Sequence, residues 1–305
     1  MGSGLLLNFP SMEEMSDQVL NAFSVDVEDG ISLAMRDRFN KNIPQTNRVV
    51  TLTKKLLELM SAHEVRGTFF ILGQVAETFP GLVREIQEGG HEIGVHGYDH
   101  HVFHKLNQEQ ARQELSRAKA LLEDLTGTGV RGHRAPAFSV DCSTDWVLDL
   151  LLELGFDYDS SIMPCQGVGY GWPGQALDIG QIVTPNGQRI NEVPLSVTSI
   201  GGRMLPALGG SYFRLLPFNF SRAIFRRIQS QRPVIMYLHP YEVDADKYPD
   251  YYFEALSRAP LRTRLRMRSF WLRRKSLLGR YDRLLKDFRF GPIVELPKVR
   301  ELLAA

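Results

Sequence analysis

Short apolar runs alternate along the chain with longer segments in which apolar residues recur every three or four positions. A short apolar run bounded by turn residues is typical of a buried β-strand, whereas the longer periodic segments are typical of amphipathic helices. The runs predict strands at 21–27, 67–72, 91–95, 130–133, 190–197, 233–238 and 293–296.

Residues that favour helix ends flank the periodic segments. Thr46 precedes one of them, and Asn107, with Gln110 three residues later, precedes another. Pro80 fits the first turn of a helix that the glycine pair at 89–90 would end. The periodicity predicts helices at 46–60, 80–88, 107–127, 143–155, 218–231 and 277–288.

The alternation of strands and helices predicts a parallel sheet, because each parallel connection needs a crossover, usually a helix. About seven such units fit an α/β fold of the incomplete (β/α) barrel type. An open doubly wound sheet is the alternative, although no GxGxxG motif follows the first strand.

Polar side chains cluster where the predicted strands end. Asp26, Glu28 and Asp29 follow the first strand, and five of the eight histidines fall between residues 91 and 104. Arg134 follows a later strand and His239 follows the strand at 233–238. In a parallel barrel the carboxyl ends of the strands meet at one rim, where active sites are built, so these side chains are expected to converge.

The spacing of His96 and His100 predicts a metal site if the turn at Gly97 brings the two rings together. Two imidazoles and one carboxylate leave open positions on a divalent metal for water and substrate. One carboxylate would bind the metal while another acts as a base. The alternative interpretation is a solvated loop rich in histidine and acid.

Two further residues complete the predicted chemistry. Arg134 can orient a carboxylate base and keep it ionised, although the same position also suits a surface arginine before a turn. His239 can act as a general acid, although a histidine after a buried strand is also common as a packed core residue. We interpret His63 and His91 as structural and leave His101, His104 and His133 undecided.

Five motifs occur in order: SVDVEDG, HEIGVHGYDHH, GHRAPAFS, DYDSSIMP and YLHPYE. Together they resemble the polysaccharide deacetylases with the NodB homology domain, carbohydrate esterase family 4. The variants resemble the branch found in exopolysaccharide and exosortase gene clusters. The resemblance implies an N-terminal tail (1–20), a NodB-like deacetylase barrel (21–245) and a basic C-terminal extension (246–305) that packs on the barrel.

The resemblance also implies roles for individual residues. Asp26 corresponds to the catalytic base, and Arg134 and His239 to the arginine and the general acid. His96 and His100 correspond to ligands of a divalent metal. We expect zinc, with cobalt, nickel, iron or manganese as alternatives.

The motif leaves two choices for the carboxylate that binds the metal. An extra residue separates Asp26 from Glu28 and Asp29, where the family has adjacent carboxylates. We expect Glu28 to be the ligand. Pairing Glu28 as the base with Asp29 as the ligand stays open.

The implied activity is metal-dependent removal of N-acetyl groups from an amino-sugar polysaccharide or its oligosaccharide precursor. Tyr98, Pro136 and Tyr212 are candidates for contact with the sugar, alongside plain packing roles. The alternatives are an allantoinase-like hydrolase of small cyclic amides, a non-catalytic glycan-binding relative, and a metal-dependent sugar isomerase or aldolase. The last would need a rim lysine or a second acid–base pair.

Composition adds constraints on partners and location. The 305 residues carry 36 basic and 35 acidic side chains, so the chain as a whole gives no reason to expect nucleic-acid binding. Cys142 and Cys165 are too few for a disulfide framework, and we interpret them as free thiols. No apolar run is long enough to span a bilayer, and no secretory signal is evident, so we expect a cytoplasmic bacterial protein.

The segment 258–289 is strongly basic. It is expected either to be a solvated helical face or to contact an acidic polymer, a lipid-linked glycan or the inner-membrane surface.

Overall fold

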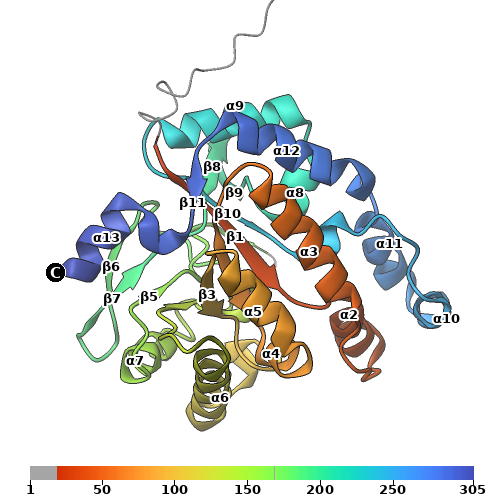
Figure 1. Cartoon of the computed structure of the whole chain (residues 1–305), viewed down its shortest axis with the longest axis horizontal. Coiled ribbons are helices and arrows are strands. Elements are labelled where there is room, and N and C mark those ends of the chain that lie inside the picture. The colour runs from red at the N-terminus through yellow and green to blue at the C-terminus, as the bar shows by residue number, and fades with distance from the viewer. Residues whose placement is uncertain (1–18, 168) are drawn as a thin grey trace, which may run out of the picture.

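The computed structural model describes residues 19–167 and 169–305, and its centre is a curled, mostly parallel sheet (Figure 1). The strand order is β10–β1–β2–β3–β4–β5–β7–β6, and β11 pairs with β1. Among the described strands of this sheet, only β6 and β7 pair in the antiparallel sense. The strands are β1 (Asn21–Val27), β2 (Thr68–Ile71), β3 (Glu92–Val95), β4 (Gly132–His133), β5 (Tyr158–Asp159), β6 (Gly180–Val183), β7 (Arg189–Glu192), β10 (Ile235–Leu238) and β11 (Phe290–Gly291).

Helices surround the sheet, and a small antiparallel pair of strands, β8 (Val197–Ile200) and β9 (Arg203–Pro206), stands apart from it (Figure 1). The helices are α2 (Gly30–Phe39), α3 (Arg48–Ser61), α4 (Gly73–Thr78), α5 (Pro80–Glu88), α6 (Gln108–Thr126), α7 (Trp146–Glu153), α8 (Gly210–Leu215), α9 (Phe218–Gln229), α10 (Asp250–Arg258), α11 (Leu261–Ser269), α12 (Leu277–Asp287) and α13 (Pro297–Ala304).

The predicted incomplete barrel is confirmed. Strands that follow one another in the chain from β1 to β5 are neighbours in the sheet, and the terminal strands of the order, β10 and β6, do not pair among the described residues. A doubly wound sheet would reverse its strand order at a switch point, so the alternative is wrong.

The two faces of the sheet pack against different clusters. In β1, Phe23, Val25 and Val27 point outward into the large core shared with the helices, whereas Ala22 belongs to a second cluster on the inner side. Because side chains alternate along a strand, Asp26 shares the inner side with Ala22. The alternation therefore directs the first carboxylate of the motif into the barrel.

The C-terminal part of the chain is integrated with the barrel. β11 pairs with the start of β1, and Tyr281, Leu284 and Leu285 of α12 are buried in the large core. A third cluster joins α10 and α11 to α2 through residues that include Met35, Tyr252 and Met267. The boundary at residue 245 stays a prediction, and the predicted tail at 1–20 lies almost entirely outside the described residues.

Some local predictions are wrong. Residues Ile293–Glu295 form a 3-10 turn, and the last strand is the preceding pair at β11. Asn47, and not Thr46, takes the N-cap position of α3, and the Thr46 hydroxyl makes no hydrogen bond with another described residue. The predicted strand at 190–197 divides between β7 and β8. By contrast, the capping box of Asn107 and Gln110 is confirmed.

Both cysteines are free thiols, as predicted. Within 19–167 and 169–305, no helix combines the length and the apolar character needed to cross a bilayer.

The contacts of His91 agree with the structural role that we predicted for it. They also make the stability of the fold depend on pH. Its Nδ1 accepts a hydrogen bond from the Gly67 N–H at 3.1 Å, which requires that nitrogen to be unprotonated. Burial, with a smaller contribution from Arg66, lowers the pKa of His91 from 6.5 to about 4. The unfolded chain therefore takes up a proton at a higher pH than the folded chain does.

We predict that His91→Gln flattens the loss of stability on acidification. In the wild-type protein this histidine reduces stability as the pH falls from 6.5 towards about 4, because only the unfolded state is then protonated at this position. Thermal unfolding across that range would measure the effect. An equally steep pH dependence in the variant would contradict the assignment.

Candidate active site

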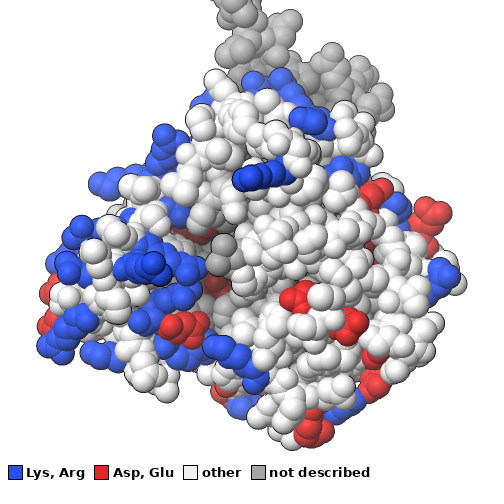
Figure 2. Space-filling view, turned by 180° about the vertical axis from the view of Figure 1, so that it is seen from behind, with Lys and Arg blue, Asp and Glu red and all other residues white. Residues whose placement is uncertain are grey.

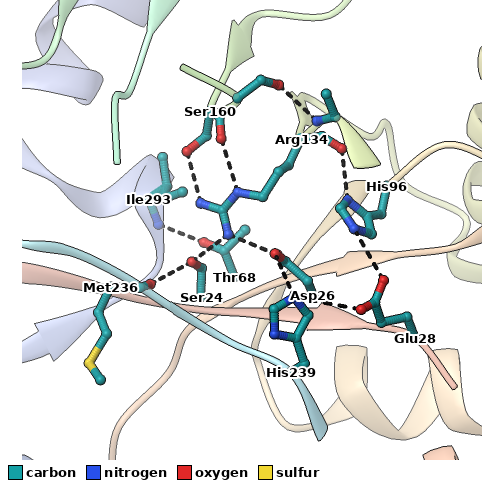
Figure 3. Close-up of polar contacts among 12 residues, drawn as sticks. Ser24, Asp26, Glu28, Thr68, His96, Arg134, Ser160, Met236, His239 and Ile293 are labelled. Carbon is teal, nitrogen blue, oxygen red and sulfur yellow. Dashed lines mark hydrogen bonds and ion pairs between the residues drawn. The ribbon is translucent and has the colours of Figure 1, made fainter. Parts of the chain in front are cut away.

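Four parallel strands carry the predicted site residues to the same rim. Asp26 lies in β1, whereas His96 directly follows β3 and His239 directly follows β10. Arg134 follows β4, and its side chain reaches back across the inner side of the barrel to β1 (Figure 3). The structure thus brings together residues separated by more than 200 positions in the chain.

A buried ion pair joins Arg134 to Asp26. Arg134 Nη1 lies 2.8 Å from Asp26 Oδ1, and both side chains are at most 1% exposed. The same nitrogen donates to Ser24 Oγ at 2.7 Å. Nε and Nη2 donate to the carbonyl and hydroxyl of Ser160 at 3.0 and 2.9 Å (Figure 3). The guanidinium is therefore anchored to β1 and to the residue that follows β5 while it holds one oxygen of the carboxylate.

The other oxygen of Asp26 is free to act on a ligand. Asp26 Oδ2 is buried, accepts no hydrogen bond, and lies 3.9 Å from His239 Nε2. A buried carboxylate oxygen without a partner is costly, which makes it a candidate for a functional contact.

Glu28, His96 and His100 form the predicted metal-binding group. One ligand atom from each lies within 4.8 Å of the others. Glu28 Oε2 is 2.9 Å from His100 Nε2 and 3.7 Å from His96 Nε2, yet it accepts no hydrogen bond of good geometry. Burial alone would raise the pKa of Glu28, but the charges of His100 and His239 hold it well below its usual range.

The turn after β3 brings His96 and His100 together, as the prediction from the HxxxH spacing assumed. Gly97 has a φ of 75°, in the left-handed region that glycine adopts without strain. His100 also has a positive φ, 57°, which folds the loop back so that the two imidazole centroids are 5.5 Å apart.

The donors fit a divalent cation. His96 Nδ1 donates to the Arg134 carbonyl at 2.8 Å, so in the neutral ring Nε2 carries a lone pair that faces Glu28. A backbone partner that fixes the tautomer in this way is usual for a metal-binding histidine. Two imidazole nitrogens and a carboxylate oxygen suit zinc and related transition metals.

Asp29 binds backbone N–H groups and is not a member of the group of Glu28, His96 and His100. Its Oδ1 accepts from the Ile31 N–H at 3.0 Å and caps α2, while Oδ2 accepts from the Thr46 N–H. Both oxygens are thus committed to backbone groups. Of the two carboxylates left open by the sequence, the structure places Glu28 beside the histidines.

His239 is surrounded by carboxylates. Its Nε2 lies 3.6 Å from Glu28 Oε1, and its Nδ1 lies 3.9 Å from Glu242 Oε2. Burial would lower the pKa of His239, but Glu28, Glu242 and Asp26 together raise it to about 9. The Tyr241 ring stacks on the imidazole at 4.9 Å between centroids. The ring is thereby held in place and in its charged form at neutral pH.

A pocket extends from the cluster towards the C-terminal segment. Glu28 and His100 form one end, and Met267, Phe270 and Arg274 form the other. The remaining lining residues are Gly30, Leu33, Ala34, Asp37, Arg38, Tyr241, Tyr248 and Tyr252. Sequence reasoning missed these aromatic residues. Only Tyr241 had a local signal, because it lies two positions after His239.

Two family models match the chain. Residues 42–158 match the model described as polysaccharide deacetylase, and residues 160–298 match a domain of unknown function, DUF3473. Residues 42–158, which are less than half of the chain, thus match a polysaccharide deacetylase domain. The match to the deacetylase model includes His96, His100 and Arg134, whereas Asp26 and Glu28 precede it and His239 lies in the second match.

Curated relatives of the deacetylase domain have related names. A peptidoglycan-N-acetylglucosamine deacetylase of Bacillus cereus is 37% identical over 84 residues, which are 28% of this chain and 30% of the relative. A peptidoglycan deacetylase of Helicobacter pylori is 35% identical over 109 residues, 36% of each chain. A chitooligosaccharide deacetylase of Azorhizobium caulinodans is 34% identical over 87 residues, 28% of this chain and 41% of the relative. The chain thus spans roughly a third of the length of these relatives.

Solved structures share the fold. A candidate polysaccharide deacetylase from Mycobacterium smegmatis aligns with a TM-score of 0.61 at 20% identity, covering 93% of this chain and 89% of its own. The allantoinase Puue aligns with a TM-score of 0.57 at 15% identity, covering 94% and 91%. At these identities the likeness shows the fold of the deacetylase domain.

Two of the residues predicted to contact sugar are buried. The Tyr98 ring is 4% exposed, packs against Gly73 and Arg117, and donates its hydroxyl proton to Glu77 at 2.5 Å. Pro136 is buried against Gly97. Both therefore pack within the loops of the deacetylase domain, and their contact with sugar stays a prediction. Tyr212 is half-buried, with its hydroxyl 3.4 Å from that of Tyr170.

The three undecided histidines each pair with a carboxylate outside the cluster. Nδ1 of His101 lies 2.5 Å from Glu114, and Nε2 of His104 lies 2.8 Å from Asp141. His133 is fully buried, with Nδ1 2.8 Å from Asp159. The first two pairs tie the segment after β3 to α6 and to the loop before α7, and the third joins the adjacent strands β4 and β5.

We predict that His96→Ala and Glu28→Gln weaken Zn²⁺ binding by more than the roughly 10–100-fold typical of losing an outer partner, because each removes a direct donor. Titration against a chromophoric chelator would measure the affinity. His239→Ala is the matched control and is expected to bind Zn²⁺ normally. The reverse order of affinities would contradict the assignment of ligands.

We predict that Arg134→Met lowers the free energy of unfolding by about 3–5 kcal/mol, because it leaves the Asp26 carboxylate buried without its partner. Urea unfolding would measure this loss. The double variant Asp26→Asn/Arg134→Met should lose less than the sum of the two single variants, since the stranded charge is gone. Additive losses would show that the two side chains do not act as a pair.

Proposed function

We propose that the protein is a metal-dependent hydrolase that removes N-acetyl groups from an amino-sugar polymer or its oligosaccharide precursor. The observation that carries this proposal is the convergence of a carboxylate, a possible metal group and a charged histidine at one rim of a deacetylase domain. The names of the curated relatives support the substrate class.

Asp26 is the proposed general base. One of its oxygens is held by Arg134, and the other is free and directed towards His239. Arg134 fixes the direction of the carboxylate, so that it can take a proton from an attacking water. A positioned base of this kind contributes rate because it needs no reorganisation during the reaction.

Glu28, His96 and His100 would hold a divalent metal, for which we propose zinc. A metal bound there supplies Lewis acidity to the acetamide carbonyl.

His239 is the proposed general acid. An amide nitrogen leaves poorly unless it is protonated, and a histidine with a pKa of about 9 carries the necessary proton at neutral pH. Tyr241 stacks on the face of the ring, and Glu242 lies near Nδ1, whereas Glu28 and Asp26 lie near Nε2. Base and acid thus face a common space from two strands.

The pocket beside Glu28 and His100 is the proposed place for the sugar. Aromatic side chains offer flat apolar faces for sugar rings, and the half-buried Tyr241 and Phe270 line it. No lysine lines this pocket, so the isomerase and aldolase interpretation gains no support. A non-catalytic relative would be expected to lack a base or a ligand, and the residues at 26, 28, 96, 100 and 239 are all present. A role in exopolysaccharide synthesis and a cytoplasmic location stay predictions from the sequence.

The test is release of acetate from N-acetylglucosamine oligosaccharides, with and without chelator and added Zn²⁺. We expect release that the chelator abolishes and Zn²⁺ restores. Asp26→Asn should lower kcat by about 10²–10⁴-fold while Zn²⁺ affinity is kept, because it removes only the base. Turnover of allantoin without acetate release from any sugar would support the small-amide alternative.

A further inference from the structure

Charge is strongly segregated in this chain. Residues 258–289 carry twelve basic and two acidic side chains, a net charge of +10, whereas the whole chain is only +1. The rest of the chain is therefore net −9. Within 258–275 there are eight basic residues and no acidic one. Figure 2 shows Lys and Arg gathered at the left, on the side of the molecule where α10 and α11 lie.

Some of these cations serve the fold and some are free for a partner. Arg274 is buried and donates to the Tyr248 hydroxyl at 2.9 Å, while Arg280 donates to the carbonyls of Arg214 and Leu216. Arg273 is exposed but donates to the Leu215 carbonyl at 2.8 Å. The other exposed cations of 258–275 are Arg258, Arg262, Arg266, Arg268 and Lys275.

Large apolar side chains stand among the exposed cations. Leu261, Leu265 and Leu272 are 67%, 57% and 55% exposed. Leu261 and Leu265 are four residues apart in α11 and share a face, which helical geometry places away from the buried Met267. The same geometry puts Arg262 on one flank of this face and Arg268 on the other. The outer side of α11 is therefore a leucine ridge between arginines.

The inner side of the same segment belongs to the pocket. Met267 and Phe270 line it together with Glu28 and His100. Burial lowers the pKa of Arg266, and the charge of Arg38, a residue that lines the pocket, lowers it further. One thin segment thus separates the outer basic face from the candidate active site.

We propose that residues 258–275 dock the protein onto the surface of an anionic phospholipid bilayer. Exposed cations are attracted to anionic headgroups, and leucines flanked by cations insert at the boundary between headgroups and acyl chains. An acidic polysaccharide would satisfy the arginines but would give the leucine ridge no apolar partner. The leucines therefore favour lipid as the occupant.

Docking would place the pocket close to the membrane and so favour a substrate located there. This consequence rests on the proposed deacetylase function. The pocket would be held about one helix diameter, roughly 10 Å, from the lipid headgroups. A glycan attached to or assembled at the membrane could then enter beside Arg38 and Arg266. Vesicle binding needs no catalysis, so a failure of docking and a failure of the proposed activity can be told apart.

The experiment is co-sedimentation of the full chain with vesicles of phosphatidylcholine alone or of phosphatidylcholine mixed with phosphatidylglycerol. We expect binding to the mixed vesicles only, and we expect it to weaken as salt is raised. Absence of binding to the mixed vesicles at low salt would overturn the proposal.

Two variants separate charge from insertion. Arg262→Gln/Arg266→Gln/Arg268→Gln should weaken vesicle binding on the order of 100-fold, since each cation contributes about five-fold. Leu261→Ser/Leu265→Ser should abolish insertion while the charge is unchanged. The matched controls are Arg84→Gln/Arg226→Gln/Arg227→Gln, with the same loss of charge from exposed positions on α5 and α9, and Leu177→Ser/Val183→Ser, with exposed apolar residues elsewhere.

Thermal unfolding checks that every variant is folded. Equal losses in the two arginine triples would show a general effect of charge and overturn the assignment to 258–275. Vesicle binding that survives the leucine substitutions, accompanied by equal binding to soluble alginate, would identify an acidic polymer as the partner in place of lipid.

Discussion

The buried contact between Arg134 and the first strand is the constraint on which the site depends. A guanidinium with no exposure to water is tolerated only when its donors are satisfied, and here Asp26, Ser24 and Ser160 satisfy them from two strands. The carbonyl of Arg134 also accepts a hydrogen bond from His96 Nδ1. One residue therefore fixes the direction of the proposed base and the tautomer of a proposed metal ligand.

The charges of Glu28 and His239, which lie next to this pair, are set by their neighbours. Glu28 is kept ionised by two histidines, and His239 is kept protonated by three carboxylates, although burial opposes both charges. Each charged form thus depends on its neighbours being charged. This arrangement explains how an acid and a base can lie within 4 Å of one another at the same rim.

The C-terminal segment gives the barrel a second structural layer at this rim. It returns through β11 to the start of β1, and on the way α10 and α11 pack against α2, which begins at the last residue of the DVEDG motif. The wall of the pocket and the basic outer face are consequently two sides of the same segment.

Much of the fold could be predicted, because it is encoded in local patterns. Apolar runs and capping residues placed β1, β2, β3, β10, α5 and α6 within a residue or two, and alternation of strands and helices indicated the open barrel. The positions of Asp26, His96, Arg134 and His239 at strand ends were enough to expect convergence, because parallel strands share one carboxyl edge.

Other features were decided only by tertiary structure. The commitment of Asp29 to capping, the burial of Tyr98, the short strand at β11 and the lining of the pocket by Met267 and Phe270 depend on contacts between segments distant in sequence. Periodicity along the chain reports which face of an element is buried. It does not report what the element is buried against, since that is set by packing among all the elements at once.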